Sequence, residues 1–594
     1  MISRQQAGGS EMVKYILHKA DICVIGGGFA GMCAAIAAAR HGAKTVIVHD
    51  RPMFGGNASS EVRMWALGAR GKNRRETGLF EEIILENMHR NPTRSFAIWD
   101  SVLFEAVKKQ EGIEAILNCS IYDAETENGK IISACGWQTT TYQHHKVEAK
   151  IFIDCSGDSI LAELSGAEYR FGREGRDEFD ESAAPIEPDR KTMGNSCLIQ
   201  ARETPFPIKY TPPKWARKIT DDSSLIGRYH RPDELRWNNF WWLELGGEQD
   251  TINDAEEIRD ELLSLSFGAW DHIKNHGDHG ADNWELEWAG FLPGKRESRR
   301  YVGDHILTQK EVLAGGKFDD VIAYGGWRID DHPPAGFDHH GEPTTYYDTP
   351  SPFGIPYRCL YSKNVENLMF AGRNISVTHV AMAASRVMGT CAVLGQAAGT
   401  AAAYAVEQGI SPRKITENIG EIQRRLMNDD CWLPGRARKI SEACKNARLE
   451  CCADDKENLR NGVDRPTDDG GDNGCKVTLG CDITYTLEKS TYVENVRIVF
   501  DSDLNRETLK GGIQVICDCP TVCNRPLDMT PYTFPSTMVR EFEVYADGEL
   551  VCRTDDNCQR LVKIPIGKEC RSIALRPLST YGDETAHIFS FDFS

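Results

Sequence analysis

A glycine-rich turn near the start of the chain constrains its fold more than any other feature. The apolar run Ile22–Ile25 leads into the sequence GGGFAG at residues 26–31, and an alanine-rich segment follows to residue 40. A G-x-G-x-x-G turn between a strand and a helix predicts a βαβ unit in which the helix N-terminus binds a dinucleotide pyrophosphate. The predicted pyrophosphate contacts are Gly26, Gly28, Phe29, Ala30 and Gly31.

The second strand of this unit, Thr45–Val48, should be followed by an acidic residue that binds the ribose hydroxyls. His49 and Asp50 occupy that position. We predict Asp50 as the ribose ligand, because a carboxylate accepts hydrogen bonds from two hydroxyls. The alternative is that Asp50 only caps the turn before Pro52.

Three later segments favour FAD over NAD, because an extended FAD needs contacts from distant parts of a domain. The loop RPMFGGNASS spans residues 51–60, the predicted strand Ile151–Asp154 runs into Ser-Gly-Asp at 156–158, and a strand at 367–372 precedes a small-residue helix at about 387–408. The further predicted cofactor contacts are Arg51, Gly55, Gly56, Asn57, Ser60, Arg63, Gly157, Asp158, Gly372, Arg373, Gly389 and Thr390.

The sequences VIGGGFAG at 24–31, GGN at 55–57, FIDCSGD at 152–158 and MFAGR at 369–373 resemble FAD-dependent oxidoreductases related to the succinate dehydrogenase and fumarate reductase flavoproteins. Long bacterial members of that family are more similar still, through LPGKRESRR at 292–300, AYGGW at 323–327 and SRVMGT at 385–390. The resemblance covers roughly residues 20–430 and implies FAD and a glutathione-reductase-like fold. Arg373 stands where the fumarate reductase pattern has a glutamate, so substrate choice and flavin attachment do not carry over.

Composition divides the α/β chain into four segments. Residues 20–170 and 362–428 are expected to form the Rossmann-type FAD-binding domain, with residues 171–361 inserted as an α+β substrate or cap domain rich in Trp, His and Pro. Short strand-like segments in residues 429–594 predict a β-sandwich, which is similar to galactose-binding-like modules. Phe589, Phe591 and Phe593 alternate with polar residues, as in a half-buried strand. Residues 1–20 are expected to be a short tail.

Flavin chemistry needs a group that gives or takes a proton, and often a cation that holds the substrate. We predict His379 as the acid or base and Arg386 as the active-site cation, since both precede the helix at about 387–408. Arg299, in the basic block 295–300, is a predicted anionic-substrate clamp, and His332 is a further catalytic candidate. The alternatives are a core histidine for His379, a structural ion pair for Arg386 and a solvated charged face for the basic block.

The tryptophans of the insertion could stack on a sugar, although core packing is the expected role of most of them. They are Trp237, Trp241, Trp242, Trp270, Trp284 and Trp288.

Two groups of potential metal ligands are interpreted without a metal. Asp271, His272, His276 and His279 have ligand-like spacing but also suit a polar loop, and the Cys517-x-Cys519-x3-Cys523 spacing fits neither a zinc ribbon nor a ferredoxin-type cluster. Twelve of the 20 cysteines follow residue 430. Because residues 1–20 lack an export signal, we expect free thiols in a reducing cytoplasm.

Several classes of protein are disfavoured. The net charge of −19 disfavours nucleic-acid binding, and no apolar run of about 18 residues predicts a membrane span. No C-x-x-C follows the first glycine turn and no second G-x-G-x-x-G follows a strand, which disfavours a disulfide reductase and a dedicated NAD(P)H domain.

We therefore expect a cytoplasmic FAD-dependent oxidoreductase, either dehydrogenase or oxidase. It would move a hydride from a small polar substrate to flavin and pass electrons to an unidentified acceptor. The C-terminal module makes a sugar or sugar acid the first candidate substrate. The alternatives are a net non-redox isomerisation or elimination through transient oxidation, and a glycan-binding scaffold with structural FAD. An oligomer is compatible with the sequence.

Overall fold

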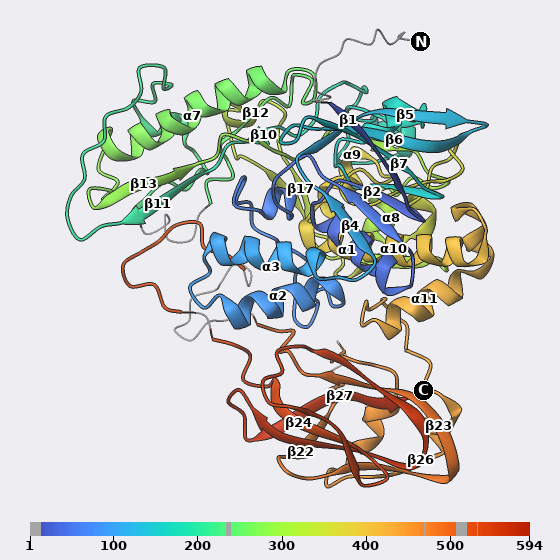
Figure 1. The fold of residues 1–594 in the computed structure, drawn as a ribbon. Helices are drawn as coiled ribbons and strands as arrows, with labels where there is room; N and C mark the ends of the chain where they lie inside the picture. The colour runs from blue at the N-terminus through green and yellow to red at the C-terminus, as the bar shows by residue number, and fades with distance from the viewer. Residues whose placement is uncertain (1–12, 233–238, 468–470, 507–519, 532) are drawn as a thin grey trace.

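The structure of the protein, a computed structural model, has a parallel sheet with helices packed against it at its centre (Figure 1). It describes residues 13–232, 239–467, 471–506, 520–531 and 533–594. The sheet has the order β20-β8-β2-β3-β4 with every pair parallel. Its strands are β2 (Ile22–Ile25), β3 (Thr45–Val48), β4 (Ile113–Ile116), β8 (Ile151–Asp154) and β20 (Leu368–Phe370). The predicted first strands are confirmed, because a sheet covered on both faces leaves continuous apolar runs in the sequence.

The helices α1 (Phe29–Arg40) and α10 (Met388–Gln408) pack backbone against backbone. A Cβ added to Gly395 would lie 2.0 Å from the Ala30 carbonyl oxygen, and one on Gly399 would lie 2.1 Å from that of Ala34. From one contact to the next, both helices advance by four residues towards their C-termini, so α1 and α10 are parallel. Six more residues of α10 than of α1 precede the first contact, so α10 begins about 10 Å before α1. The amphipathic segments predicted after the first unit are α2 (Leu79–Arg90) and α3 (Phe96–Lys108).

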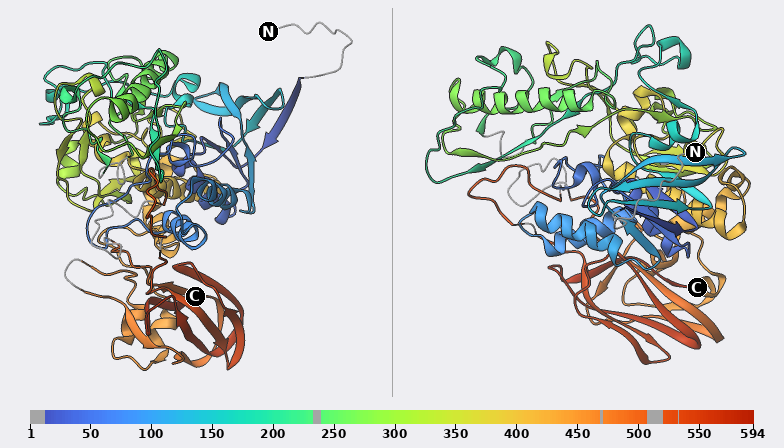
Figure 2. Two further views of the ribbon diagram at one scale, coloured as in Figure 1. Left: turned by 90° about the vertical axis from the view of Figure 1, so that its left-hand side faces the viewer. Right: turned by 45° about the horizontal axis from the view of Figure 1, so that its top comes forward.

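A second sheet, with the order β1-β7-β6-β5, shows that the tail predicted for residues 1–20 was wrong in its later part. Lys14–Lys19 forms β1, which pairs in parallel with β7 (Gln143–Glu148) at the outer edge of this sheet (Figure 2). Most β1 side chains are exposed, including the apolar Tyr15 and Leu17, and its apolar run of three residues is too short to predict a strand. His18 is its buried residue, with Nε2 2.9 Å from His145 Nδ1. The other strands of this sheet are β5 (Cys119–Glu127) and β6 (Lys130–Gln138).

The middle of the chain forms an α+β unit beside the central sheet, with the long helix α7 (Ala255–Asn275) on its outer face (Figure 1). Its small sheets pair β10 (Asn195–Ser196) with β12 (Glu244–Leu245) and β14 (Gly294–Lys295), and β11 (Ile199–Glu203) with β13 (Trp284–Ala289). Trp242, Trp270 and Trp284 are buried in its hydrophobic core, as expected for most tryptophans of this region. Trp237 lies outside the described residues.

The C-terminal part is an antiparallel β domain with its own core. It contains β22 (Cys475–Thr478), β23 (Ile483–Phe500), β24 (Val539–Ala546), β25 (Glu549–Thr554), β26 (Leu561–Thr580) and β27 (Thr585–Phe593), and β21 (Arg448–Glu450) pairs with β23. β26 is one continuous strand of 20 residues, longer than the short strand-like segments expected in this part of the chain. The half-buried interpretation of β27 was wrong: Ser590 and Asp592 are buried too, because Arg438 binds both side chains.

An arm of the C-terminal domain crosses to the α+β unit (Figure 1). The Arg525 backbone N–H donates to the Ala201 carbonyl at 2.9 Å, and the Glu203 N–H donates to the Arg525 carbonyl at 2.8 Å. Cys523, which is buried on this arm, has its Sγ 3.7 Å from the Arg63 carbonyl oxygen. The C-terminal domain therefore contacts the neighbourhood of the predicted cofactor loop.

Among the described residues, no helix is long and apolar enough to cross a membrane. The 18 cysteines of this part of the chain have free thiols. Cys517 and Cys519 lie outside the described residues.

Candidate functional site

The glycine turn has the geometry that a pyrophosphate requires. Gly26 has a φ of 99° at the end of β2, and a Cβ on Gly31 would lie 1.8 Å from the Gly26 carbonyl oxygen. Gly28 is the N-cap of α1, whose first turn has neither a side-chain cap nor an acidic residue. The first N–H groups of the helix therefore keep their positive end for an anion.

The loop after β3 closes on this turn. The Gly55 N–H donates to the Gly27 carbonyl at 2.8 Å, and Gly28 and Gly55 form an isolated parallel bridge. The nearest atom to a Cβ on Gly28 would be the Gly56 Cα at 3.9 Å. The two backbones thus run side by side without side chains between them, and a cofactor phosphate can reach both.

The two residues after β3 have different surroundings. His49 is buried, and its Nδ1 lies 3.0 Å from the Gly27 backbone nitrogen and 3.2 Å from Asp50 Oδ1. Asp50 is half exposed, and its Oδ2 lies 3.3 Å from Arg51 Nε. Its carboxylate is therefore accessible at the end of the strand, and ribose binding by Asp50 stays a prediction.

Asp158 and Arg373 meet where β8 and β20 end. Arg373 Nη2 lies 2.7 Å from Asp158 Oδ1, and Lys295 Nζ lies 2.7 Å from Oδ2. Burial would raise the pKa of Asp158, but the charges of Lys295 and Arg373 lower it. Arg373 also donates to the carbonyls of Gly157 and Lys295 at 3.1 and 2.7 Å. These bonds join the predicted cofactor segments into one wall.

Two residues that belong to, or pair with, predicted cofactor segments have buried polar atoms without a hydrogen-bond partner. These atoms are Thr390 Oγ1, near the start of α10, and both amide atoms of Asn195. Asn195 pairs with Lys295 across the antiparallel strands β10 and β14, so the two side chains lie on the same face. The Asn195 amide is therefore directed to the side on which Lys295 binds Asp158, and the sequence analysis missed this residue.

The residues fit FAD. An uncapped helix N-terminus, a glycine cradle and unpaired buried amide and hydroxyl groups match a ligand with a pyrophosphate and several polar edges. Ser60 is held nearby, since its N–H donates to Asp100 at 3.1 Å, and Asn57 Nδ2 donates to the Lys295 carbonyl at 3.1 Å.

Glu76 is a further buried acid that the sequence analysis did not select. A Cβ on Gly389 would lie 2.9 Å from the Glu76 carboxyl carbon, and the Ala69 N–H donates to Glu76 Oε1 at 2.8 Å. Burial raises the pKa of Glu76 to about 7. The start of α10 thus packs on a carboxyl group that titrates near neutral pH.

The segment 295–300 connects the cofactor wall to a second set of polar groups. Lys295 and Ser298 bind Asp158, at 2.7 and 2.8 Å. Arg296, Glu297 and Arg300 are buried and form ion pairs on the other side. One stretch of six residues therefore lines both sites.

His379, the first residue of α9 (His379–Ser385), lies between two carboxylates. Its Nδ1 is 2.8 Å from Glu297 Oε2, and its Nε2 is 3.1 Å from Asp331 Oδ1. Burial would lower the pKa of His379, but Glu297 and Asp331 raise it to about 10. The imidazole is therefore protonated at neutral pH, which excludes it as a general base there and leaves the role of acid or fixed cation.

His332 and Arg386 adjoin another pair of carboxylates, Glu244 and Asp330, and Asp330 lies next to Asp331 on β17 (Ile329–Asp331). His332 Nδ1 lies 2.6 Å from Glu244 Oε2 and its Nε2 lies 3.3 Å from Asp330 Oδ1, while Arg386 Nη2 lies 3.6 Å from Asp330 Oδ2. Burial would lower the pKa of His332, but Glu244 and Asp330 raise it. We call ten of these paired groups the polar cluster: Glu174, Glu244, Glu297, Asp330, Asp331, Arg296, Arg300, Arg386, His332 and His379. Glu174 also lies 3.7 Å from Arg170, whose charge is balanced by Glu178 at 2.6 Å.

Arg299 does not join the polar cluster, and its role as an anionic-substrate clamp stays a prediction. Its guanidinium lies 3.2 Å from Glu163 and 5.4 Å from the centre of the Tyr169 ring. Residues 296–299 form no regular strand, so their side chains do not alternate, and Arg296, Glu297 and Arg300 enter the cluster while Arg299 does not. Arg63 stacks between the rings of Trp288 and Phe96, at 4.2 and 4.7 Å.

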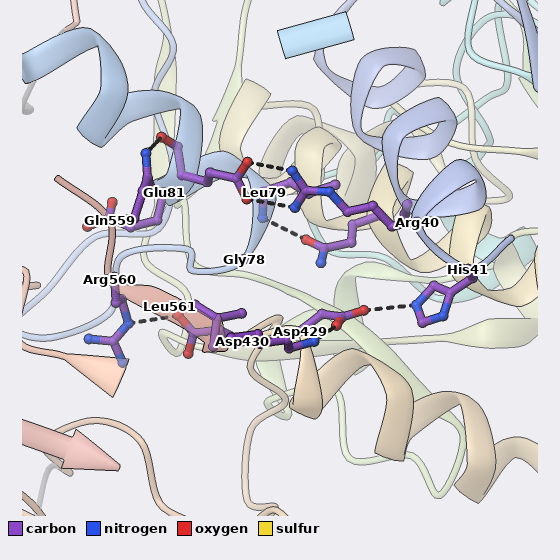
Figure 3. Close-up of a pocket in the computed structure, with 14 residues that line it drawn as sticks. Arg40, His41, Gly78, Leu79, Glu81, Asp429, Asp430, Gln559, Arg560 and Leu561 are labelled. Carbon is purple, nitrogen blue, oxygen red and sulfur yellow. Dashed lines mark hydrogen bonds and ion pairs between the residues drawn. The ribbon is translucent and has the colours of Figure 1, made fainter. Parts of the chain in front are cut away.

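A separate cavity of about 620 Å³ lies between α1 and the C-terminal domain (Figure 3). The charged groups around it pair with one another: Arg40 binds Glu82, and His41 binds Asp429 at 2.8 Å. Arg560, buried in the wall, donates to Asp430 at 2.8 Å. This cavity adjoins the C-terminal end of α1, at the opposite end from the glycine turn, so it is not the cofactor site.

A family model described as FAD dependent oxidoreductase matches residues 21–426. No curated protein matches the chain in sequence.

Three solved structures illustrate the distant structural likenesses. A geranylgeranyl bacteriochlorophyll reductase-like protein from Thermoplasma acidophilum is 13% identical, with 70% of this chain and 86% of that chain covered and a TM-score of 0.32. A flavocytochrome c3 fumarate reductase is 14% identical, with 66% and 79% covered and a TM-score of 0.27. A family 32 carbohydrate-binding module from Streptococcus pneumoniae EndoD is 12% identical, with 26% and 99% covered and a TM-score of 0.18. Likenesses this weak carry no argument, and the family assignment rests on the family model.

Proposed function

Since the chain belongs to the FAD-dependent oxidoreductase family, we propose that this enzyme oxidises an uncharged, polyhydroxylated substrate of carbohydrate type at the edge of the polar cluster. When bound, FAD supplies the hydride acceptor. The residues that would hold it are those of the glycine turn, the loop at 55–60 and the wall formed by Asp158, Arg373 and Lys295.

The balance of charge in the polar cluster carries this proposal. Its five carboxylates face three arginines and two histidines, and the pKa values of both histidines are raised. The set is neutral when both imidazoles are protonated. A charged substrate would leave a net charge buried beside the cofactor, which costs several kcal/mol, whereas hydroxyl groups add hydrogen bonds without adding charge.

Accessibility indicates which groups a substrate meets. The side chains of His379 and Glu297 are 2% and 0% exposed, whereas those of Asp331, Asp330 and Arg386 are 20%, 15% and 14% exposed. The outer groups are thus two carboxylates that accept hydrogen bonds and one guanidinium that donates them. This combination suits a substrate with several hydroxyl groups.

Asp331 is the proposed acceptor of the substrate hydroxyl proton. Burial would raise the pKa of Asp331, but His379 lowers it, so the carboxylate is ionised at neutral pH. Glu297 fixes the imidazole from behind at 2.8 Å. In this arrangement His379 is a positioning residue that orients Asp331 and balances its charge, and Asp331 forms the hydrogen bond with the substrate.

The test is an anaerobic absorbance spectrum of the FAD-loaded protein with matched pairs of neutral sugars and the corresponding uronic acids. We expect the oxidised-flavin band to bleach with a neutral sugar, and Asp331→Asn to abolish bleaching while the FAD content is retained. Glu163→Gln is the matched control, because that carboxylate binds Arg299 outside the cluster. Bleaching by uronic acids alone would contradict the charge argument, and a band that no compound bleaches would favour a net non-redox reaction or a scaffold.

A further inference from the structure

A second group of potential ligands lies in the α+β unit, apart from the flavin site. Asp222 belongs to the short helix η2 (Asp222–Ser224), His230 to the loop after it, His272 to the last turn of α7, and His279 to the loop that follows α7. One ligand atom from each of these residues lies within 4.8 Å of those from the other three. We call these four residues the histidine cluster.

Hydrogen bonds to backbone carbonyls orient two of the rings. His272 Nδ1 lies 3.0 Å from the Ile219 carbonyl oxygen, and His230 Nδ1 lies 2.6 Å from that of Arg228. A carbonyl only accepts, so each Nδ1 carries a proton, and Nε2 is the ring nitrogen on the side of Asp222. Both Nε2 atoms are turned to Asp222 Oδ1, at 2.9 and 3.7 Å. Metal-binding histidines are commonly oriented by such a bond from the second ring nitrogen.

His279 completes the group. Its side chain is 3% exposed, and its Nε2 lies 2.9 Å from the His276 carbonyl oxygen and 3.6 Å from the same Asp222 oxygen, so Nε2 carries the proton. Its Nδ1 is buried and has no hydrogen-bond partner. The ring centre lies 4.8 Å from those of both His230 and His272. The ring is therefore held inside the cluster with one nitrogen unsatisfied.

The arrangement calls for a cation. A second proton on His272 would pair that ring with Asp222 but would leave the buried Nδ1 of His279 without a partner, and protonating every ring would place like charges within about 6 Å. A single divalent ion satisfies all four groups at once. The geometry points to a zinc site with three histidines and one aspartate, which together supply the four ligands of a tetrahedral site.

Such an ion would join the C-terminal end of α7 to the loop at 219–230. The sequence spacing alone does not identify the site, since it groups His272 with Asp271 and His276. The structure excludes those two: His276 is 37% exposed and lies 3.3 Å from Asp271. Asp222 and His230, about 40 to 50 residues earlier in the chain, take their place.

The test uses the full-length, FAD-loaded protein dialysed against a chelator and then titrated with Zn²⁺ or Co²⁺. We expect one Zn²⁺ per chain by elemental analysis, a tetrahedral Co²⁺ absorption spectrum, and higher thermal stability with metal. His272→Ala and His279→Ala should weaken binding at least tenfold, whereas His276→Ala, from the same end of α7, should leave it unchanged.

Asp222→Asn is a second variant that should not disturb the hydrophobic core, because the Asp222 side chain is 66% exposed. It should weaken Co²⁺ binding and change its spectrum while the flavin content stays constant. Equal metal binding by the wild type and by Asp222→Asn and His272→Ala, or no binding by the folded wild type, would overturn the proposal. Neither result depends on the flavin reaction, so the two proposals fail separately.

Discussion

Replacing His379 with glutamine tests whether a protonated imidazole holds the polar cluster together. The pKa of His379 is raised to about 10, because the effect of Glu297 and Asp331 exceeds that of burial. A group with a raised pKa in the folded state stabilises the protein fully below its unfolded pKa of about 6.5, and this contribution is lost as the pH rises toward 10. A shift of about 3.5 units corresponds to at most about 5 kcal/mol of unfolding free energy.

We therefore expect His379→Gln to lower the unfolding free energy by about 3–5 kcal/mol at pH 6, the cost of leaving buried carboxylates unpaired. The difference from the wild type should shrink steadily up to pH 10. The measurement is urea denaturation at several pH values, followed by tryptophan fluorescence and flavin release. His276→Gln is the matched control, since that ring is 37% exposed.

A wild type and a His379→Gln variant whose stabilities fall in parallel between pH 6 and 10 would refute this account. Hydrogen exchange at the imidazole C2 position of His379, measured by mass spectrometry, gives an independent reading. A midpoint near 6.5 in the wild type would show that the two carboxylates do not hold the proton on the ring.

Three further predictions address the cofactor site and the domain interface. Gly28→Ala should fold normally, because the new Cβ would meet only Gly56 at 3.9 Å. The variant should nevertheless lose FAD affinity at least tenfold, because the Cβ would keep the cofactor phosphate away from the backbone. Unchanged FAD content would show that the phosphate does not lie against Gly28. Because burial raises the pKa of Glu76 to about 7, the unfolding free energy of the wild type should fall as the pH rises from about 4.5 past 7. Glu76→Gln should remove up to about 3 kcal/mol of that fall, measured as unfolding free energies at pH 5 and 8. Equal pH dependence in both proteins would contradict this prediction. Arg560→Met should destabilise the protein by about 3–5 kcal/mol, because it leaves Asp430 unpaired. Adding Asp430→Asn to this variant should restore part of the lost melting temperature. No restoration would show that the two residues do not act as a pair.

The local pattern of apolar residues and glycines was sufficient to predict the dinucleotide-binding fold. Ile22–Ile25, Thr45–Val48 and Ile151–Asp154 are strands as predicted, since buried parallel strands leave apolar runs. The glycine turn was equally readable, because Gly31 must lack a Cβ for α1 to approach β2. These features depend on residues close together in the chain. The edge strand β1 was not predicted, because most of its side chains are exposed and it has no continuous run of buried apolar residues.

The tertiary structure decided which charged groups act together. The sequence placed His379, His332 and Arg386 near the flavin, but it could not separate Arg299 from Glu297, two residues apart in one block. Their environments depend on which side of the segment faces β17 and α9, and on partners such as Asp331 that are more than 30 residues away. The histidine cluster could not be predicted for the same reason, since only the packing of the 219–230 loop against α7 brings Asp222 to His272. Backbone pattern is local and can be read along the chain, whereas the pairing of buried charges follows from packing between distant segments.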